Sequence, residues 1–227
     1  MNRSKSSSPG PRRSDRKDAV ANRQALLDAA ARVFSEQGYK EARVRDICGV
    51  AGLNVGAINQ HFGSKENLYR EVIVRAGKSL SEQVACPRLE DFDSAEEALR
   101  AWMEYHLTLA LLRRAKDPIA GPLLMREFRN PTEAMESFAE LVIQPIRAEL
   151  LRIIGALLGE DDSPPLRAAA ANFVFGLDVF PALAGPMLKR LGQSLPTRKS
   201  DIDKLLNLMH PFVLGGIRAL KDRPARS

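Results

Sequence analysis

The feature that most limits the fold of this chain is the spacing of its hydrophobic residues, which follows a helical period almost throughout. In one early segment Leu26, Ala30 and Phe34 recur at intervals of four residues, which places them on one face of a helix. No segment alternates hydrophobic and polar residues over a useful length, which is the pattern of a half-buried strand. We therefore expect an all-α fold with about nine helices and no internal repeat.

Glycine, proline and capping residues indicate where these helices start and break. Ser94 and the glutamate three residues later form a capping box, which marks the start of a long helix. Pro145 should kink the helix that contains it, because proline lacks the N–H group needed for the helical hydrogen bond. A bend or break is expected near Pro181 or residues 185–186, and a last helix at about residues 201–220.

The positive charge of the chain is concentrated in its first third. Residues 1–80 hold 15 Lys and Arg against 8 Asp and Glu, whereas residues 81–227 hold 19 against 20. A basic segment joined to a neutral one is typical of nucleic-acid binders, although basic N-terminal tails also occur for other reasons. We expect a flexible basic arm at residues 1–17, a first helical domain at residues 18–84 and a second at residues 90–222.

Residues 44–62 form the most informative motif of the chain. Two short amphipathic segments flank residues 52–54 (GLN), where Gly52 permits the positive φ of a sharp turn between two helices. Ile58 and Phe62 lie four residues apart and can anchor the second segment to a core. Its other edge carries small and hydrogen-bonding groups that can approach base edges in a DNA major groove. The motif, at about residues 44–63, therefore predicts a helix-turn-helix.

This region resembles the DNA-binding domain of the TetR family of transcriptional regulators. The resemblance covers about residues 20–68 and rests on residues 38–39 (GY), 44–47 (VRDI), 51–58 (AGLNVGAI) and 61–68 (HFGSKENL). Asn59, where many relatives have tyrosine, and residues 145–150 (PIRAEL) are similar to the branch with a CerR-type C-terminal domain. The resemblance implies an N-terminal three-helix DNA-binding domain and a larger helical domain for ligand binding and dimerisation.

The resemblance also implies a function. Members of this family bind a palindromic operator in double-stranded DNA as homodimers, and they release it when a small-molecule inducer fills the C-terminal domain. We expect a cytoplasmic, nucleoid-associated repressor of this kind, with an amphipathic organic inducer. The alternative is a DNA-binding regulator without a small-molecule ligand, whose C-terminal domain serves dimerisation only. Activation in place of repression also stays open.

Roles in DNA binding follow residue by residue from the matching motifs. Asn and Gln side chains suit the edge of adenine, and the methyl groups of Ala and Val suit the thymine methyl. His61 resembles the family position that meets a phosphate, and Lys65 adds its charge at the start of the next helix. The expected DNA-binding residues are Arg43, Arg45, Asn54, Val55, Gly56, Ala57, Asn59, Gln60, His61 and Lys65.

One departure from the family pattern concerns the start of the first motif helix. Many relatives have a capping Thr or Ser there, whereas this chain has Ala42 and Arg43. The loss of such a cap costs about 1 kcal/mol. We expect Arg43 and Arg45 to replace the missing phosphate contact through their charge.

Plainer roles remain open for several of these positions. Val55 and Ala57 can be packing residues, His61 can simply end a helix, and Lys65 can be a solvated lysine. The arm at residues 1–17 can track the duplex or be an idle tail.

The second domain contains apolar and aromatic stripes that can line a cavity between helices. Such stripes are more often plain core, and His106 within one of them is more often a satisfied core histidine than an anchor for an inducer. The candidate ligand-binding residues are Trp102, Met103, His106, Met125, Phe128, Phe138 and Phe173. The family pattern implies that the last two long helices, at about residues 164–190 and 201–220, pair with their symmetry mates in a four-helix bundle.

Other classes of protein are disfavoured. The three histidines lie far apart in the sequence, and no catalytic triad, zinc-protease motif, phosphate loop or dinucleotide fingerprint occurs, so we expect no enzyme and no cofactor. Cys48 and Cys86 lack the spacing of a metal site or a disulfide framework. No apolar run approaches the roughly 18 residues that span a bilayer, and the N-terminal residues lack a signal-peptide core. We therefore expect no membrane association.

Overall fold

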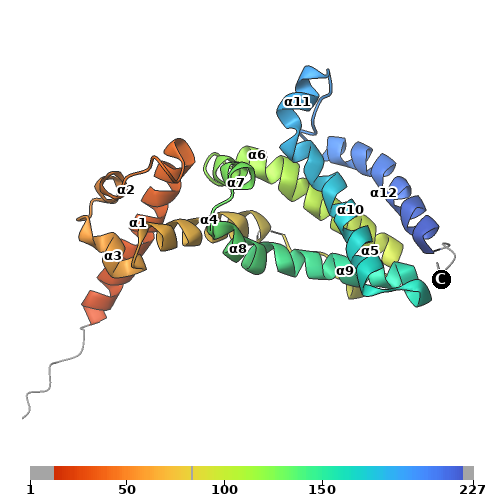
Figure 1. Ribbon diagram of the computed structural model, residues 1–227, viewed down its shortest axis with the longest axis horizontal. Coiled ribbons are helices and arrows are strands. Elements are labelled where there is room, and N and C mark those ends of the chain that lie inside the picture. Colours follow the sequence, from red (N-terminus) through yellow and green to blue (C-terminus); the bar gives the residue numbers. More distant parts are fainter. Residues whose placement is uncertain (1–12, 83, 222–227) are drawn as a thin grey trace, which may run out of the picture. The chain divides into compact units, whose positions relative to one another are not determined.

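The computed structural model describes residues 13–82 and 84–221, which are almost entirely helical (Figure 1). The all-α fold expected from the hydrophobic period is confirmed, and no strand occurs in these residues. Twelve α-helical segments, several of them joined end to end, compare with the nine helices expected. Contacts divide the chain into two compact units, with the division between Val72 and Ile73.

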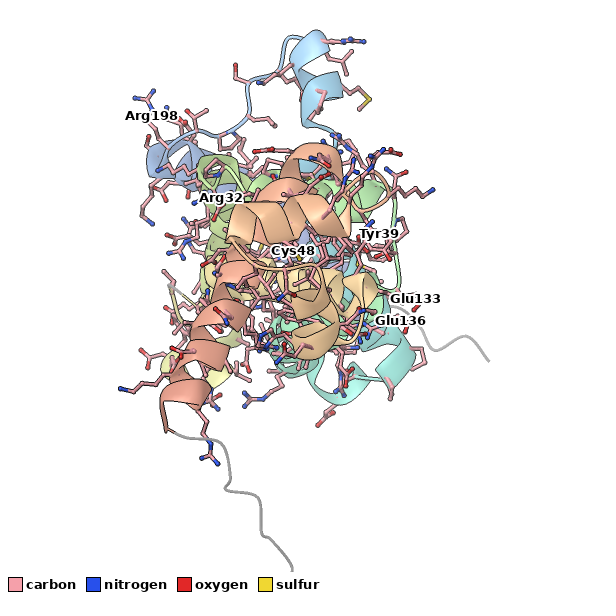
Figure 2. The ribbon with its side chains drawn as sticks, turned by 90° about the vertical axis from the view of Figure 1, so that its left-hand side faces the viewer. Arg32, Tyr39, Cys48, Glu133, Glu136 and Arg198 are labelled. Carbon is pink, nitrogen blue, oxygen red and sulfur yellow. The ribbon has the colours of Figure 1, made fainter. Side chains whose placement is uncertain are left out.

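The N-terminal unit is a small helical bundle. It contains α1 (Arg13–Gln37), α2 (Val44–Ala51), α3 (Gly56–Phe62) and the first half of α4 (Lys65–Ser81). All four helices contribute to its interior, which includes the buried residues Leu26, Phe34, Ile47, Cys48, Ile58, Phe62 and Leu68; Cys48 is labelled in Figure 2. Because isolated helices as short as α2 and α3 are unstable in water, this shared core holds both of them in place.

The helix α1 starts earlier than the sequence pattern predicts. The last five residues of the expected arm, residues 13–17, form the first turns of α1. Arg and Lys are good helix formers, and each residue added to an existing helix gains a hydrogen bond, so the helix extends into this basic segment. The rest of the expected arm, residues 1–12, lies outside the described residues.

The helix α4 belongs to both units, and this shifts the domain boundary. The division falls inside α4, whereas the expected boundary lies at residues 84–90. Gly77 packs against the ring of Phe138, which an added Cβ atom would overlap. Arg113 Nη1 also donates a hydrogen bond to the carbonyl of Leu80 at 3.1 Å. The second half of α4 is thus part of the C-terminal unit.

The C-terminal unit is a larger helical bundle. Its further helices are α5 (Ala95–Leu107), α6 (Arg114–Lys116), α7 (Ala120–Arg129), α8 (Ala134–Phe138), α9 (Gln144–Leu158), α10 (Pro164–Leu183), α11 (Gly185–Arg190) and α12 (Lys199–Lys221). Short 3-10 turns cover Leu89–Asp91 and Gly159–Asp161. The helices α5, α9, α10 and α12 pack around one hydrophobic core. Figure 1 shows α11 projecting from the end of α10.

Two π-helical turns interrupt the helices of this unit. Thr108–Arg113 joins α5 to α6, and Ala139–Ile143 joins α8 to α9. The second turn precedes Pro145, whose nitrogen has no hydrogen for an α-helical bond, and the N–H of Gln144 instead bonds to the carbonyl five residues before it. The disruption expected at Pro145 thus takes the form of a widened turn.

Several expected helix limits are confirmed. Ser94 Oγ accepts a hydrogen bond from the N–H of Glu97 at 3.2 Å and so caps α5. The break expected at residues 181–186 occurs at Ala184, between α10 and α11, while Pro181 lies inside α10. The last helix, α12, exceeds its expected range by two residues at one end and one at the other.

Candidate nucleic-acid interface

The turn between α2 and α3 has the geometry that the sequence motif requires. Gly52 ends α2 in the left-handed region, with φ 68° and ψ 27°. Its N–H bonds to the carbonyl of Gly49 at 3.2 Å, and the next N–H, of Leu53, bonds to the carbonyl of Cys48 at 2.9 Å. These bonds satisfy carbonyl groups at the end of α2 and direct the chain sharply into α3.

The helix α3 has one buried and one exposed face. Ile58 and Phe62 are buried and anchor the helix, as expected from their spacing. Val55, Asn59 and Gln60 are exposed on the other face. Val55 is 56% exposed, so its methyl groups are accessible from solvent.

Ala57 was expected to contact a base, but the structure places it in the core. It is only 6% exposed, because it lies on the same side of α3 as Ile58. A methyl group enclosed by the N-terminal core does not reach a base edge. The packing role that the sequence left open is therefore the correct one for Ala57.

Asn54 and Gly56 shape the start of α3. Both are exposed, and the carbonyl of Asn54 accepts the N–H of Ala57 at 3.0 Å, which begins the helix. A Cβ atom on Gly56 would lie 3.2 Å from Oδ1 of Asn54, so a larger residue would crowd this corner. The start of α3 therefore presents backbone and a small amide to solvent.

Two arginines lie at the start of α2. Arg43 precedes the helix and forms no side-chain cap, which confirms the missing cap inferred from the sequence. Arg43 and Arg45 are both exposed, and Arg45 Nε lies 3.5 Å from Asp46 Oδ1. Both guanidinium groups therefore extend into solvent from the first turn of the motif.

The turn between α3 and α4 is built by a glycine and a cap. Gly63 has φ 77°, and its N–H bonds to the carbonyl of Asn59 at 3.1 Å. Ser64 Oγ accepts the N–H of Asn67 at 3.1 Å, as the sequence predicts for a cap of α4. Asn67 Nδ2 in turn donates to the carbonyl of Phe62 at 2.9 Å, which ties the two helices together.

Lys65 and His61 lie on either side of this turn. The ammonium group of Lys65 lies 4.6 Å from the ring centre of Tyr39, a cation–π contact that positions it. Burial lowers the pKa of Lys65, and Glu41 acts in the opposite sense. His61 is half-buried near the end of α3. Sequence reasoning missed the role of Tyr39, although the residue belongs to the family motif; Figure 2 labels it.

Arg23 of α1 contacts both α3 and α4. Its guanidinium pairs with Glu71 of α4 and lies 4.8 Å from the ring centre of Phe62. The rings of Phe34, Tyr39 and Tyr69 also form a contact series, with centroid distances of 4.8 Å and 4.7 Å to Tyr69. The exposed face of α3 is thus backed by an ion pair, a cation–π contact and a cluster of packed aromatic rings.

The seven candidate ligand-binding residues do not surround one cavity in the described part of the C-terminal unit. Trp102 and Met103 are fully buried in the core, which is the plainer role that the sequence left open. Phe128 and Phe138 form an edge-to-face pair at 5.7 Å, and Met125 lies half-buried on α7 near them. Phe173, in contrast, is 64% exposed on α10.

His106 proves to have a partner that the sequence did not reveal. Its Nδ1 lies 3.4 Å from Oδ2 of Asp178 on α10, and both side chains are buried. Its ring stacks on Trp102 at 4.9 Å, with an interplanar angle of 17°. Burial raises the pKa of Asp178, while the contact with His106 acts in the opposite sense.

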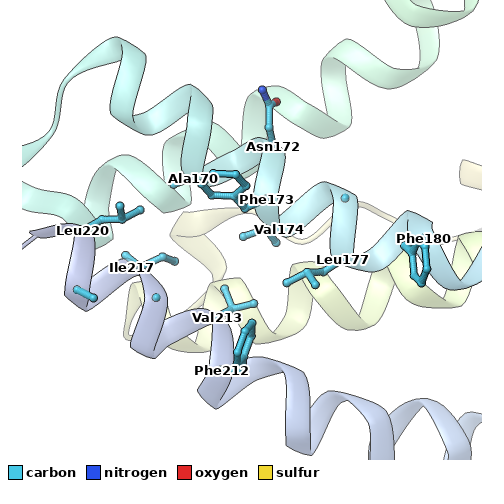
Figure 3. A pocket seen from close by; sticks show the side chains of 13 residues that line it. Ala170, Asn172, Phe173, Val174, Leu177, Phe180, Phe212, Val213, Ile217 and Leu220 are labelled. Carbon is cyan, nitrogen blue, oxygen red and sulfur yellow. The ribbon is translucent and has the colours of Figure 1, made fainter.

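An apolar groove of about 660 Å³ lies between α10 and α12. Figure 3 shows Phe173, Leu177 and Phe180 of α10 on one side, and Phe212, Val213 and Ile217 of α12 on the other. A second hollow of about 330 Å³ lies beside α5 and is lined in part by Glu104, Tyr105, Thr108 and Arg113. Of the seven candidates, only Phe173 lines either hollow.

Helix α10 is apolar enough to raise the question whether the chain could span a membrane. By length and composition it is the one helix in the described part of the chain that could cross a bilayer, and 28% of its most apolar window is buried. One such helix is weak evidence for a membrane protein, and Asp178 lies within it. In the same residues no group of three His, Cys, Asp or Glu side chains could hold a metal ion.

Two family models match this chain. Residues 26–72 match "Bacterial regulatory proteins, tetR family", and residues 95–217 match "HTH-type transcriptional dual regulator CecR, C-terminal domain". The first match contains α2, α3 and the adjoining parts of α1 and α4, and the second runs from α5 into α12.

Two curated relatives are transcriptional regulators. The HTH-type transcriptional dual regulator CecR of Shigella flexneri is 31% identical over 151 residues, which cover 60% of this chain and 64% of the relative. The HTH-type transcriptional repressor AcnR of Corynebacterium glutamicum is 36% identical over 106 residues, or 43% of this chain and 53% of the relative. The matched part therefore spans less than two thirds of each relative.

Solved structures share the fold over most of the chain. The flavonoid-responsive regulator FrrA superposes with a TM-score of 0.64 at 24% identity, covering 86% of this chain and 96% of that one. FadR of Bacillus subtilis, in complex with stearoyl-CoA, superposes with a TM-score of 0.59 at 20% identity, covering 85% and 98%.

Proposed function

The chain belongs to the TetR family of bacterial regulatory proteins, and on this premise we propose that it is a ligand-responsive transcriptional repressor that binds a palindromic operator as a homodimer and is released by a small amphipathic molecule. Its C-terminal domain matches the CecR type. The branch expected from the sequence was named CerR, and CecR is the correct name. The relatives it matches are transcriptional regulators and not enzymes.

The observation that carries this proposal is the exposed face of α3. Asn59 and Gln60 each offer a donor and an acceptor, which together suit the N6 and N7 atoms of adenine. Val55 offers an apolar contact for a thymine methyl group, which would explain its exposure. Ile58 and Phe62 hold this face outward, so α3 is a rigid reading helix for the major groove.

Charged groups at neighbouring helix ends supply contacts to the DNA backbone. Arg43 and Arg45 extend from the start of α2, and Lys65 is held by Tyr39 at the start of α4. His61 lies at the end of α3, between them in the sequence. Such contacts fix the register of a protein on the duplex without reading its sequence.

The groove between α10 and α12 supports dimerisation. Phe173 and Phe212 are 64% and 72% exposed, and Phe180 and Leu208 are exposed beside them. Exposed apolar side chains that gather on one face are typical of an interface between subunits. We assign the groove to the partner subunit and not to the inducer. A symmetric dimer of this kind would read two half-sites about 34–36 Å apart.

The ligand response rests on the fold of the C-terminal unit. Two structures with this fold are described by small organic molecules, stearoyl-CoA for FadR and flavonoids for FrrA. Both molecules combine a large apolar body with polar groups. A pocket between helices that takes such molecules is consistent with the aromatic residues around α5, α7 and α10.

The test is DNA binding by the purified full-length protein to the intergenic region upstream of its own gene, at two salt concentrations. The variant Gln60→Ala removes a base contact and should weaken specific binding by about 1–3 kcal/mol. Gln37→Ala is the matched control, because Gln37 is also exposed but is the last residue of α1 and belongs to neither motif helix.

Salt-sensitive binding to a palindrome that Gln60→Ala weakens and Gln37→Ala preserves would support the repressor. A protein without specific binding to this region would next be tested by selection from random DNA sequences. Failure to select any sequence there would refute the proposed function.

A further inference from the structure

The pair formed by His106 of α5 and Asp178 of α10 differs from the other buried charged groups among the described residues. Asp178 is 0% exposed and His106 is 6% exposed. Glu127 is also buried, but it accepts hydrogen bonds from the N–H of Thr132 at 2.8 Å and its hydroxyl at 3.0 Å. Neither carboxylate oxygen of Asp178 receives a hydrogen bond from any described residue.

His106 does not supply the missing donor. Its Nδ1 lies 3.4 Å from Oδ2 of Asp178, near enough for an ion pair, but it makes no hydrogen bond itself. The ring is instead held by stacking on Trp102 at 4.9 Å and by a tilted contact with Phe175, with ring centroids 4.7 Å apart. The indole N–H of Trp102 is already used by the carbonyl of Ile146 at 3.1 Å.

A buried carboxylate without a donor is costly to maintain. Nearly all buried polar side chains in proteins are hydrogen-bonded, and each exception needs an explanation. The surrounding core is otherwise apolar, so a residue such as leucine at position 178 would avoid the cost. Within the described residues, His106 is thus the only polar partner of Asp178, and the carboxyl group has room for a further hydrogen-bond donor.

Phe175 is a partly buried neighbour of the pair. Its ring contacts the imidazole of His106. Two residues after His106, the α-helical bonding of α5 gives way to the π-helical turn Thr108–Arg113. Such widened turns occur frequently at functional sites, because they adjust more readily than regular helix.

We propose that His106 and Asp178 form the polar end of a ligand site for an amphipathic organic cation, whose protonated amine donates to Asp178 and whose apolar body packs against the partly buried ring of Phe175. Hydrogen bonds from a cation to a carboxylate are among the strongest in proteins, and aromatic faces attract cations. A carboxylate at the site disfavours anions. The inference rests on the ligand response proposed above and gives the inducer a chemical class.

The test uses three probes with one carbon skeleton and different end groups: 4-phenylbutylamine, 4-phenylbutanol and 4-phenylbutyrate. Their binding to the full-length protein is measured by ligand-observed NMR at neutral pH, and binding of the protein to its operator is measured in parallel. The amine should bind at least about tenfold more tightly than the alcohol, because it adds a charge-assisted hydrogen bond. The carboxylate should bind most weakly.

Two variants assign the preference to one side chain. Asp178→Asn keeps the size of the residue and removes its charge, so the amine and the alcohol should then bind within about twofold of each other. Asp203→Asn on α12 is the matched control, because this carboxylate is half-exposed, and the preference should persist. Circular dichroism checks the fold of each variant, and His106→Gln replaces Asp178→Asn if the latter does not fold.

Equal binding of the amine and the alcohol to the natural chain, or a preference that survives in Asp178→Asn, overturns the proposal. Binding of none of the probes overturns it as well, and leaves water as the occupant of the site. The parallel operator measurement separates the two ideas. If the operator is bound specifically but no amine preference exists, only the ligand class fails; if specific operator binding is absent, the proposed function fails.

Discussion

Gly49 and Gly52 lie three residues apart at the end of α2, and the same substitution should change stability in opposite directions at the two positions. Gly49 lies inside the helix, whereas Gly52 ends it with φ 68° in the left-handed region. A Cβ atom added at either position would have no other atom within 4 Å. Neither substitution changes packing, so only the backbone conformation distinguishes them.

The magnitudes follow from this difference. A Cβ atom in the left-handed conformation costs roughly 1–2 kcal/mol, and the lower entropy of the unfolded chain offsets part of it, so Gly52→Ala should destabilise the motif by about 1 kcal/mol. Alanine is better than glycine inside a helix by about 0.8–1.0 kcal/mol, so Gly49→Ala should stabilise the motif by nearly that amount.

Native-state hydrogen exchange of the α2 and α3 amides in the full-length protein measures both effects at their source. Each change of about 1 kcal/mol corresponds to roughly a fivefold change in the opening equilibrium. Protection should fall in Gly52→Ala and rise in Gly49→Ala, at equal protein concentration. A loss of protection in both variants, or in neither, would refute the argument from backbone conformation.

Three further predictions concern the charge, the pH response and the assembly of the protein. Arg43→Gln and Arg45→Gln should each reduce the slope of log binding constant against log salt by about 1, as measured by fluorescence anisotropy, while Arg32→Gln on α1 should leave it unchanged. Because burial raises the pKa of Asp178, the folded protein retains a proton that the unfolded chain releases above about pH 4. The free energy of unfolding should therefore fall as the pH rises from there to the raised pKa, and Asp178→Asn should flatten this fall in urea titrations. Phe212→Glu should place a charge in the groove between α10 and α12 and shift the protein to monomers in analytical ultracentrifugation, and a dimer of unchanged stability would contradict our assignment of that groove.

Local signals in the sequence account for the parts of the fold that were predicted well. A glycine with positive φ at position 52, a serine cap at position 64 and a chain break near position 184 each depend on a few adjacent residues. The side of a short helix is harder to predict. With only seven residues in α3, the pattern could not decide whether Ala57 faced the core or the solvent, and the neighbouring packing decides it.

Features that depend on distant residues could not be predicted. Asp178 meets His106 across 72 positions of sequence, and no periodicity of α5 or α10 indicates that pairing. The division of contacts inside α4 has no signal in the sequence, because the helical period continues unchanged across it while the packing partners change. The dispersal of the candidate ligand-binding residues has the same cause, because aromatic stripes on different helices look alike until their neighbours are known.

The stacking of Trp102 on His106 gives the protein an internal optical reporter. Trp102 is the one tryptophan of the chain, so all indole emission comes from a ring that stacks on the imidazole at 4.9 Å. A molecule that displaces either ring changes the surroundings of the indole and therefore shifts its emission spectrum. Occupancy of this place can therefore be followed in the natural protein, without any label, by its fluorescence alone.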